Sequence, residues 1–280
     1  MSSPVPFDFG RAGADEVAFF LAEAALAAGP AVMEVYRGGG DVEVKADGSP
    51  VTTADRRAEA VVCAHLSRAL NAPPIAAEES IAAGKRLALG ERFLLVDPLD
   101  GTREFIARNG EFTINIALIE GGRPRAGAVY APAIARVWFG GERAFVCAAA
   151  DGSGFPEASA WRAIHARAAP PRLVALASRS HAEPETEAFL EMLPIAERLA
   201  RGSSLKFCAI AEGSADVYPR FGPTMEWDTA AGEAVLCAAG GVVLTLSGEP
   251  LAYGKVAEGL RNPPFVAWGD VGAARLLRER

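Results

Sequence analysis

The chain has 280 residues, half of them hydrophobic, so it can bury a substantial core and is not disordered by composition. Its net charge of −7 excludes a protein that coats nucleic acid, because such proteins carry a surplus of lysine and arginine. A small anionic ligand remains compatible with this charge, since a few basic groups or metal ions can dominate one pocket.

Hydrophobic periodicity predicts a mixed α+β or α/β layered protein in which helices and strands interleave. Before residue 149 the expected elements are a helix at 15–36, a strand at 42–45, a turn at 47–50, a helix at 53–70 with Thr53 as N-cap, a strand at 93–96, a hairpin of 111–120 and 125–130, and strands at 135–139 and 144–148. After residue 171 they are a strand at 173–178, helices at 185–193, from 202–204 and at 228–239, and a strand at 242–246. The Gly-, Ala- and Pro-rich stretch between them predicts a boundary between two parts.

The cysteines and the apolar segments indicate a cytoplasmic protein. No uncharged apolar run reaches the ~18 residues of a membrane span, and Glu23 interrupts the best candidate. The N-terminus lacks the basic start of a secretory signal. The thiols are expected to be buried in a reducing cytosol, since they lie far apart in apolar surroundings: Cys63, Cys147, Cys208 and Cys237. The histidines show no zinc-ligand spacing; His65 is expected to pack on its helix, and the role of His181 stays open.

The most informative segment follows the apolar strand at 93–96. Asp97 ends that strand, and Asp100 returns three residues later on the same side, beyond a turn at Pro98. Two carboxylates this close repel each other unless they are protonated or bridged by a cation. Gly101 and the hydroxyl of Thr102 stand where a helix can start, and N–H groups at a helix start bind anions. A polar turn with an N-capping aspartate is the alternative interpretation.

Three further acidic segments are ambiguous when each is taken alone. A surface loop or a helix cap explains each of them as well as a functional site does. They are Glu78 with Glu79 after an apolar run, Asp55 in the first turn of a helix, and Asp228 after Trp227 at another helix start.

Taken in order, these motifs resemble the inositol monophosphatase superfamily of magnesium-dependent, lithium-sensitive phosphatases, over residues 17–265. The segments that carry the resemblance are KADGSPVTTAD (45–55), AAEES (76–80), the run from VDPLDGTREF onward (96–133), SRSHA (178–182) and the run from GSSLKF to GEAV (202–235). The resemblance implies a layered α-β-α-β-α sandwich. Its metal cleft would lie between an N-terminal α+β part, 1–160, and a C-terminal α/β part, 161–280.

The resemblance also implies two to three Mg²⁺ ions and their ligands. Glu78, Asp97 and the carbonyl of Leu99 would hold one ion, and Asp97, Asp100 and Asp228 a second. A third, weaker ion would rest on Glu78 and waters. Ligation by oxygen alone suits Mg²⁺, which keeps several waters and takes phosphate oxygens as further ligands.

In the same family, a metal-activated water attacks phosphorus directly and in line, with no phospho-enzyme. Thr102, hydrogen-bonded to Asp55, would accept the proton, with Glu78 also near that water. The N–H groups of Gly101 and Thr102 would hold the phosphate, and Asp228 would face the substrate.

The residues expected to determine the substrate resemble those of the 3′(2′),5′-bisphosphate nucleotidase branch of the family. Asp-Gly-Thr-Arg-Glu-Phe at 100–105 is characteristic of that branch, whereas inositol phosphatases usually carry Thr-Asn after the threonine. Arg220 stands where the inositol branch has a glutamate, and with Lys206 it suits a second phosphate. Further N–H donors are expected at a helix start: Gly202, Ser203 and Ser204. The expected reaction converts adenosine 3′,5′-bisphosphate to AMP and phosphate, with the analogue carrying sulfate on its 5′-phosphate as a second substrate.

Two alternatives remain open from the sequence. One is a broad phosphatase for inositol phosphate, fructose bisphosphate or histidinol phosphate, since the same metal core serves all of them. The other is a non-catalytic metal-binding scaffold or nucleotide sensor, which would lack at least one of the key residues; all of them are present: Glu78, Asp97, Asp100, Thr102 and Asp228. The expected partner is a small nucleotide and no nucleic acid polymer. The sequence leaves open peripheral association with the inner membrane, as in some relatives, and the choice between monomer and homodimer.

Overall fold

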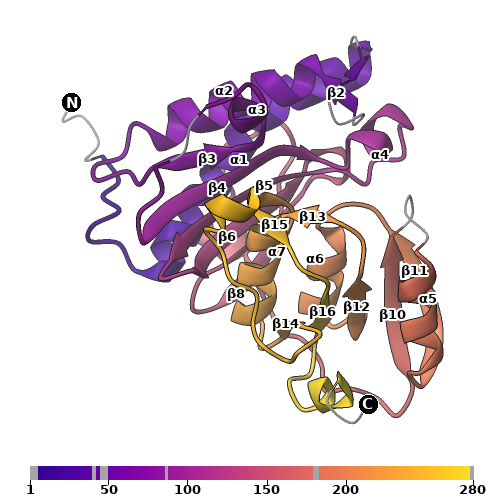
Figure 1. Ribbon diagram of the computed structural model, residues 1–280. Coiled ribbons are helices and arrows are strands. Elements are labelled where there is room, and N and C mark those ends of the chain that lie inside the picture. Colours follow the sequence, from indigo (N-terminus) through magenta and orange to yellow (C-terminus); the bar gives the residue numbers. More distant parts are fainter. Residues whose placement is uncertain (1–5, 40–41, 45–49, 86–87, 179–182, 278–280) are drawn as a thin grey trace.

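The computed structural model describes residues 6–39, 42–44, 50–85, 88–178 and 183–277. Of the turn expected at 47–50, residues 47–49 lie outside the described residues, and so does His181. Within the described chain, two large sheets are separated by a layer of helices and carry further helices on their outer faces (Figure 1). This is the layered α-β-α-β-α arrangement that the family resemblance implies.

The first sheet holds seven strands and comes from the first part of the chain. In spatial order they are β3 (Ile75–Ala77), β4 (Arg92–Asp100), β5 (Thr113–Glu120), β6 (Arg123–Ala131), β7 (Arg136–Gly140), β8 (Ala144–Ala148) and β9 (Arg162–Ile164). Only β3 and β4 run parallel; the other neighbours are antiparallel. The last strand lies beyond residue 160, so this sheet draws on the glycine- and proline-rich stretch that the sequence marks as a boundary.

Helices cover both faces of the first sheet, which explains why its central strands are apolar at consecutive positions. One face carries α1 (Ala14–Gly38) and α2 (Thr53–Leu66), and the other carries α6 (Leu205–Ala211) and α7 (Glu226–Ala238) (Figure 1). Helix α7 packs closely because β6 offers Gly127, where a Cβ atom would come within 2.8 Å of the Cβ of Ala234. Helix α1 is long and apolar enough to cross a membrane, but 67% of its most apolar window is buried in this core.

The second sheet holds five strands, in the order β11-β10-β12-β16-β14. Their bounds are β10 (Leu173–Ser178), β11 (Ile195–Arg201), β12 (Val217–Arg220), β14 (Val242–Thr245) and β16 (Phe265–Trp268). Alternate residues of β10 face opposite cores: Leu176 packs in the cluster that contains α6 and α7, and Ala175 packs with Phe189 of the outer helix α5 (Pro184–Glu191).

Short elements complete the chain. They are β1 (Val42–Val44) paired with β2 (Pro50–Thr52), β13 (Thr224–Met225) paired with β15 (Arg261–Asn262), α3 (Glu78–Ala82), α4 (Thr102–Ile106), and the 3-10 turns η1 (Pro132–Ile134), η2 (Ala158–Ala160), η3 (Val256–Glu258) and η4 (Ala273–Leu277).

Two local expectations are wrong. Thr52, not Thr53, caps α2: its hydroxyl accepts the N–H of Ala54 at 3.1 Å, and its own N–H donates to Asp55 at 2.7 Å. This reciprocal pair is a capping box, in which the aspartate takes the place of the usual glutamate. Not all thiols are buried, because Cys237 is exposed, although all four cysteines are free. His65 packs as expected, 5.1 Å from the ring of Phe20.

A buried acid lies inside the layer of helices. Glu233 on α7 is 4% exposed, and its carboxylate accepts a hydrogen bond from the hydroxyl of Tyr253. That hydroxyl also lies 3.1 Å from the Oγ1 atom of Thr229. Burial raises the pKa of Glu233 to about 8, although the bond from Tyr253 works in the opposite direction.

We expect the Glu233→Gln variant to be more stable than the wild type at alkaline pH. Below the ordinary value of 4.5 the carboxyl is protonated in both folded and unfolded chains, so it does not affect folding. From there up to about 8 the unfolded chain releases the proton and the folded chain keeps it, so the free energy of unfolding falls as the pH rises. Glutamine avoids this loss and keeps an acceptor for Tyr253. The stability advantage of the variant should grow across that window by about 1.4 kcal/mol per pH unit, up to a few kcal/mol. Urea titrations at several pH values measure it.

The matched control is Glu249→Gln, which removes a negative charge from an exposed residue. Unfolding free energies of Glu233→Gln and wild type that differ by the same amount at every pH would show that Glu233 is not a buried, protonated acid.

Candidate active site

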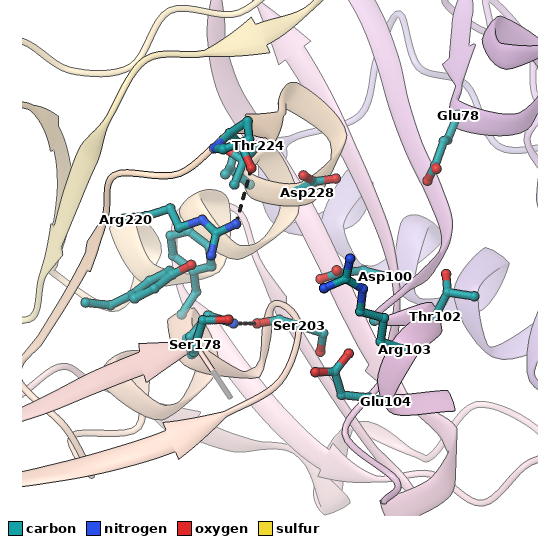
Figure 2. A pocket seen from close by; sticks show the side chains of 16 residues that line it. Glu78, Asp100, Thr102, Arg103, Glu104, Ser178, Ser203, Arg220, Thr224 and Asp228 are labelled. Carbon is teal, nitrogen blue, oxygen red and sulfur yellow. Dashed lines mark hydrogen bonds between the residues drawn. The ribbon is translucent and has the colours of Figure 1, made fainter. Parts of the chain in front are cut away.

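Three of the expected acidic residues line a pocket between the first sheet and the start of α7, and Asp55 and Asp97 do not line it. The pocket has a volume of about 280 Å³, near the lower end for small-molecule sites. Figure 2 shows Glu78, Asp100 and Asp228 reaching toward the same space from three elements that lie far apart in the sequence. The other expected residues that line it are Gly101, Thr102, Ser203, Lys206 and Arg220.

Strand β4 delivers two of the carboxylates because its end is irregular. Its pairing with β5 is regular up to Asp97 and then shifts before Asp100, across Pro98, which has no N–H to donate to a ladder. The N–H of Leu99 turns back onto the Oδ1 atom of Asp97 at 3.0 Å. Asp97 is 2% exposed and lies behind the pocket, whereas Asp100 lines it.

The remaining carboxylate comes from the second part of the chain. Asp228 stands in the first turn of α7, where its Oδ2 atom accepts the N–H of Met225 at 2.7 Å. The preceding acid, Glu226, is fully buried and does not face the pocket. It accepts the N–H groups of Gly254 and Lys255 and the Lys255 ammonium, which pins the segment after β14 to the start of α7.

These carboxylates are close enough to influence one another's protonation. Burial, followed by the charges of Glu78, Asp100 and Asp228, raises the pKa of Asp97 well above its usual range. Burial and the charge of Asp100 likewise raise the pKa of Asp228. Burial raises the pKa of Asp100, although the charge of Lys206 and the bonds from Ser204 oppose that shift. Acids from both parts of the chain therefore form one electrostatic cluster.

Such a cluster fits a hard divalent cation. Its donors are oxygen atoms only, which is the set that Mg²⁺ prefers, and a bound cation would offset the repulsion that now raises their pKa values. Within the described residues, no three His, Cys, Asp or Glu side chains already stand in a coordination geometry. The fit therefore rests on donor type, burial and charge. The carbonyl of Leu99 lies beside this cluster, 3.3 Å from the Oγ1 atom of Thr102.

Asp55 and Thr102 approach each other on the first-sheet side of the pocket. The Oγ1 atom of Thr102 lies 3.5 Å from the Oδ1 atom of Asp55, while the Oδ2 atom of Asp55 is held by the hydroxyl and the N–H of Thr52, both at 2.7 Å. Burial raises the pKa of Asp55 to about 6, although the bonds from Thr52 work against that shift. Thr52 thus orients Asp55 so that the Oδ1 atom of Asp55 points toward Thr102.

Glu78 owes its position to another acid that the sequence did not single out. Glu78 is the first residue of α3. The carboxylate of Glu59 on α2 accepts the next two N–H groups, from Glu79 at 2.7 Å and Ser80 at 2.9 Å. Glu59 is 7% exposed, so this cap is shielded from water. Helix α3 is too short to be stable alone, and Glu59 anchors it.

Two of the expected basic side chains line the same pocket, and Arg220 reaches it from the side opposite Glu78 (Figure 2). Arg220, at the end of β12, is 8% exposed; its Nη1 atom lies 3.3 Å from Glu183, and its Nη2 atom donates to the carbonyl of Pro223 at 3.2 Å. Its Nε atom is buried with no hydrogen-bond partner among the described residues. The Nζ atom of Lys206 donates to the carbonyl of Ser203 at 2.6 Å, and burial lowers the pKa of Lys206 to about 8, partly opposed by Asp100.

The expected amide donors at 202–204 are largely engaged within the chain. The N–H of Gly202 donates to Glu111 at 2.8 Å, and that of Ser204 donates to Asp100 at 2.7 Å. Ser203 differs, because its buried hydroxyl has no partner in the described part of the chain and its residue lines the pocket.

Sequence reasoning missed part of the pocket lining. The additional residues are Arg103, Glu104, Ser178, Phe207, Tyr218, Pro223, Thr224 and Thr229. Arg103 and Glu104 belong to the motif that suggested the family branch, so a signal for them was present. Tyr218 and Thr224 come from short strands that hydrophobic periodicity does not predict.

Comparison with known proteins matches almost the whole chain. A sequence model of the inositol monophosphatase family matches residues 14–273. The chain is 46% identical over 241 residues to the 3′(2′),5′-bisphosphate nucleotidase CysQ of Escherichia coli strain K12, which covers 85% of this chain and 94% of that protein. The protein of the same name in Buchnera aphidicola is 40% identical over 235 residues, 83% of this chain and 86% of that one.

Solved structures share the fold as well. The crystal structure of CysQ from Bacteroides thetaiotaomicron, described as a bacterial member of the inositol monophosphatase family, matches with a TM-score of 0.77 and 38% identity, over 91% of this chain and 97% of that one. An inositol monophosphatase from Zymomonas mobilis matches with a TM-score of 0.72 and 25% identity, over 96% of this chain and 100% of that one.

Proposed function

The chain belongs to the inositol monophosphatase family, and we propose that it is a magnesium-dependent phosphatase that removes the 3′-phosphate of adenosine 3′,5′-bisphosphate, giving AMP and phosphate. The CysQ relatives named as 3′(2′),5′-bisphosphate nucleotidases align over most of this chain and support this choice. The analogue with sulfate on its 5′-phosphate is proposed as a second substrate.

One observation carries the proposal: half-buried carboxylates and basic side chains line a single pocket. Glu78 and Asp100 lie across the pocket from Arg220 (Figure 2), and Asp228 and Lys206 line it as well. Carboxylates suit cations that bind the ester to be cleaved, whereas a guanidinium and an ammonium suit a second, uncleaved phosphate. The pocket therefore offers both kinds of charge that a substrate with two phosphates would need.

In the proposed mechanism, Glu78, Asp97 and the Leu99 carbonyl would hold one Mg²⁺, and Asp97, Asp100 and Asp228 a second. When bound, the ions would supply a water of lowered pKa and neutralise charge on the phosphate and the leaving oxygen. Each carboxylate acts by holding its oxygen in place before the substrate arrives, so that little reorganisation is needed during the reaction.

Proton removal is assigned to the pair of Asp55 and Thr102. The hydroxyl of Thr102 lines the pocket and can take a proton from an attacking water as it passes its own to Asp55. Thr52 holds the second oxygen of Asp55, which keeps the first directed at Thr102. The N–H groups of Gly101 and Thr102 would bind the transferred phosphate; Gly101 can adopt the required φ of +88° because it has no side chain.

The second phosphate is assigned to Arg220, with help from Lys206. A guanidinium has five N–H donors, and the contacts to Glu183 and Pro223 leave others for a ligand. Ser203 could add its hydroxyl. The inositol branch uses a glutamate to accept hydrogen bonds from sugar hydroxyls, and Glu226 cannot serve that purpose here, because the chain's own donors surround it.

The decisive experiment compares two substrates with and without Mg²⁺. We expect kcat/KM for adenosine 3′,5′-bisphosphate to exceed that for inositol 1-phosphate by at least about 100-fold, in keeping with a charge-assisted contact to the second phosphate. EDTA should abolish phosphate release from both substrates. A preference for inositol phosphate would replace the proposed substrate with that of the alternative branch. Hydrolysis that survives EDTA would contradict the metal mechanism.

The cap that Glu59 provides to α3 leads to a further prediction. Glu59→Ala should lower kcat by about 10- to 100-fold, the usual effect of removing a group that holds a metal ligand in place. Glu59→Gln should fall between this variant and the wild type, because it keeps one acceptor for the two N–H groups. The control is Glu34→Ala, which removes an exposed carboxylate that pairs with Arg57 at 3.3 Å. A Glu59→Ala enzyme with wild-type kcat would show that the cap does not position Glu78.

A further inference from the structure

A buried asparagine lies directly behind the carboxylate cluster. Asn115 on β5 is 1% exposed and is the residue that pairs with Asp97 in the β4–β5 ladder. Its Nδ2 atom donates to the Oγ atom of Ser204 at 2.9 Å and lies 3.4 Å from the Oδ2 atom of Asp100. Its Oδ1 atom is buried without a partner among the described residues. An amide half-satisfied in this way destabilises a core, so packing alone does not account for it.

Ser204 connects this asparagine to both parts of the chain. It is 1% exposed at the start of α6, and its N–H donates to the Oδ2 atom of Asp100 at 2.7 Å. Its Oγ atom lies 2.8 Å from the carbonyl oxygen of Asp228 and 3.1 Å from the Oδ2 atom of Asp100. One residue therefore contacts a carboxylate delivered by the first sheet and the backbone of another delivered by α7.

The direction of these hydrogen bonds follows from counting protons. The serine hydroxyl has one proton, and the carbonyl of Asp228 is its nearer acceptor. Asp100 already receives the N–H of Ser204, so the hydroxyl is free to donate to Asp228 while it accepts from Asn115. The result is a chain from β5 through α6 to the first turn of α7.

We propose that Asn115 and Ser204 are positioning residues that fix the separation between Asp100 and Asp228 across the two parts of the chain. They hold one oxygen of Asp100 and the backbone of Asp228, and leave the other oxygen of Asp100 for a cation. This inference rests on the proposed function in one respect, namely that Asp100 and Asp228 are cation ligands. It assigns to these two residues a role in assembling the site rather than in contacting substrate.

The test uses Ser204→Ala, Asn115→Ala and the double variant. Calorimetry with Mn²⁺ alone, in the absence of substrate, measures cation affinity, and steady-state kinetics give kcat and KM separately. We expect each single variant to bind Mn²⁺ about 10- to 100-fold more weakly and to lose kcat to a similar extent. KM for the nucleotide at saturating cation should stay within about twofold. The double variant should bind Mn²⁺ no more weakly than the single variant with the lower affinity, since both substitutions break the same series of hydrogen bonds.

The matched control is Ser214→Ala, which removes an exposed serine hydroxyl that donates to the carbonyl of Ala209 at 2.8 Å and does not line the pocket. Asn115→Ala leaves the backbone of α6 intact and tests the same chain if Ser204→Ala does not fold. A lowered melting temperature with unchanged Mn²⁺ affinity in both single variants would overturn the inference. If the wild-type protein neither binds Mn²⁺ nor hydrolyses the nucleotide, the proposed function itself fails. If the wild type binds Mn²⁺ and the variants bind it equally well, this inference alone fails.

Discussion

The Asp97→Asn variant should lose hydrolysis by at least about 1,000-fold and yet melt at a higher temperature than the wild type when no divalent cation is present. Asp97 would ligate both proposed ions, so removing its charge removes the centre of the site. Asparagine keeps the Oδ1 acceptor that receives the N–H of Leu99 at 3.0 Å. Phosphate release and differential scanning calorimetry measure the two effects on the same sample.

The expected gain in stability follows from the sign of the pKa shift. Burial and the neighbouring acids raise the pKa of Asp97 above its ordinary value of 3.8, so its stabilising contribution is complete below that value and is lost as the pH rises. At pH 8 the variant escapes this loss, and each kcal/mol recovered raises the melting temperature by about 2–4 °C in a protein of this size. Added Mg²⁺ should stabilise the wild type and leave Asp97→Asn almost unchanged.

A control of opposite sign is available in the same chain. Hydrogen bonds from the N–H groups of Ala169 and Gly272 lower the pKa of Asp270, so its ionised form stabilises the fold. Asp270→Asn should therefore melt at a lower temperature at pH 8 and keep full activity. If Asp97→Asn is less stable than the wild type without cation, the charge of Asp97 does not destabilise the fold.

The Arg220→Gln variant should raise KM for adenosine 3′,5′-bisphosphate by about 10- to 100-fold, the value of a lost hydrogen bond to a charged group. Activity toward adenosine 3′-monophosphate, which lacks the second phosphate, should change by less than about threefold. The reason is that Arg220 faces the pocket from the side opposite Glu78 and Asp100, two of the acids that would bind the cleaved ester. Steady-state kinetics with the two nucleotides provide the comparison.

The control for Arg220→Gln is Arg198→Gln, which removes a surface arginine paired with Glu187. Glu183 is not left alone in the variant, because it still accepts the N–H of Gly222 and the hydroxyl of Thr186. Equal losses of kcat/KM for both nucleotides would show that Arg220 supports the fold of the pocket rather than contacting the second phosphate. Arg220→Lys should recover only part of the affinity, since an ammonium lacks the fork of a guanidinium.

Local sequence determined most helices and strands of the first sheet. The apolar run at 93–96 and the hairpin expected at 111–130 correspond to β4, β5 and β6, because a strand covered on both faces must be apolar at consecutive positions. Strands β11, β12 and β16 were not expected. Strand β11 lies at the sheet edge, where most of its side chains face water, and β12 carries a proline, so neither shows the usual period.

The identity of the acidic residues and the family were readable from the sequence alone, because a strand end, a turn and a helix start are local features and their residue types are chemically specific. Their convergence was implied by the family resemblance and by no local pattern of residues. That Asp228 shares an electrostatic field with Asp97 depends on how α7 packs against the first sheet, which no spacing along the chain encodes. The sequence named Ser204 only as an N–H donor for substrate, and it did not single out Glu59 or Asn115. Their supporting contacts became visible only in three dimensions, since their partners lie 20, 15 and 24 residues away.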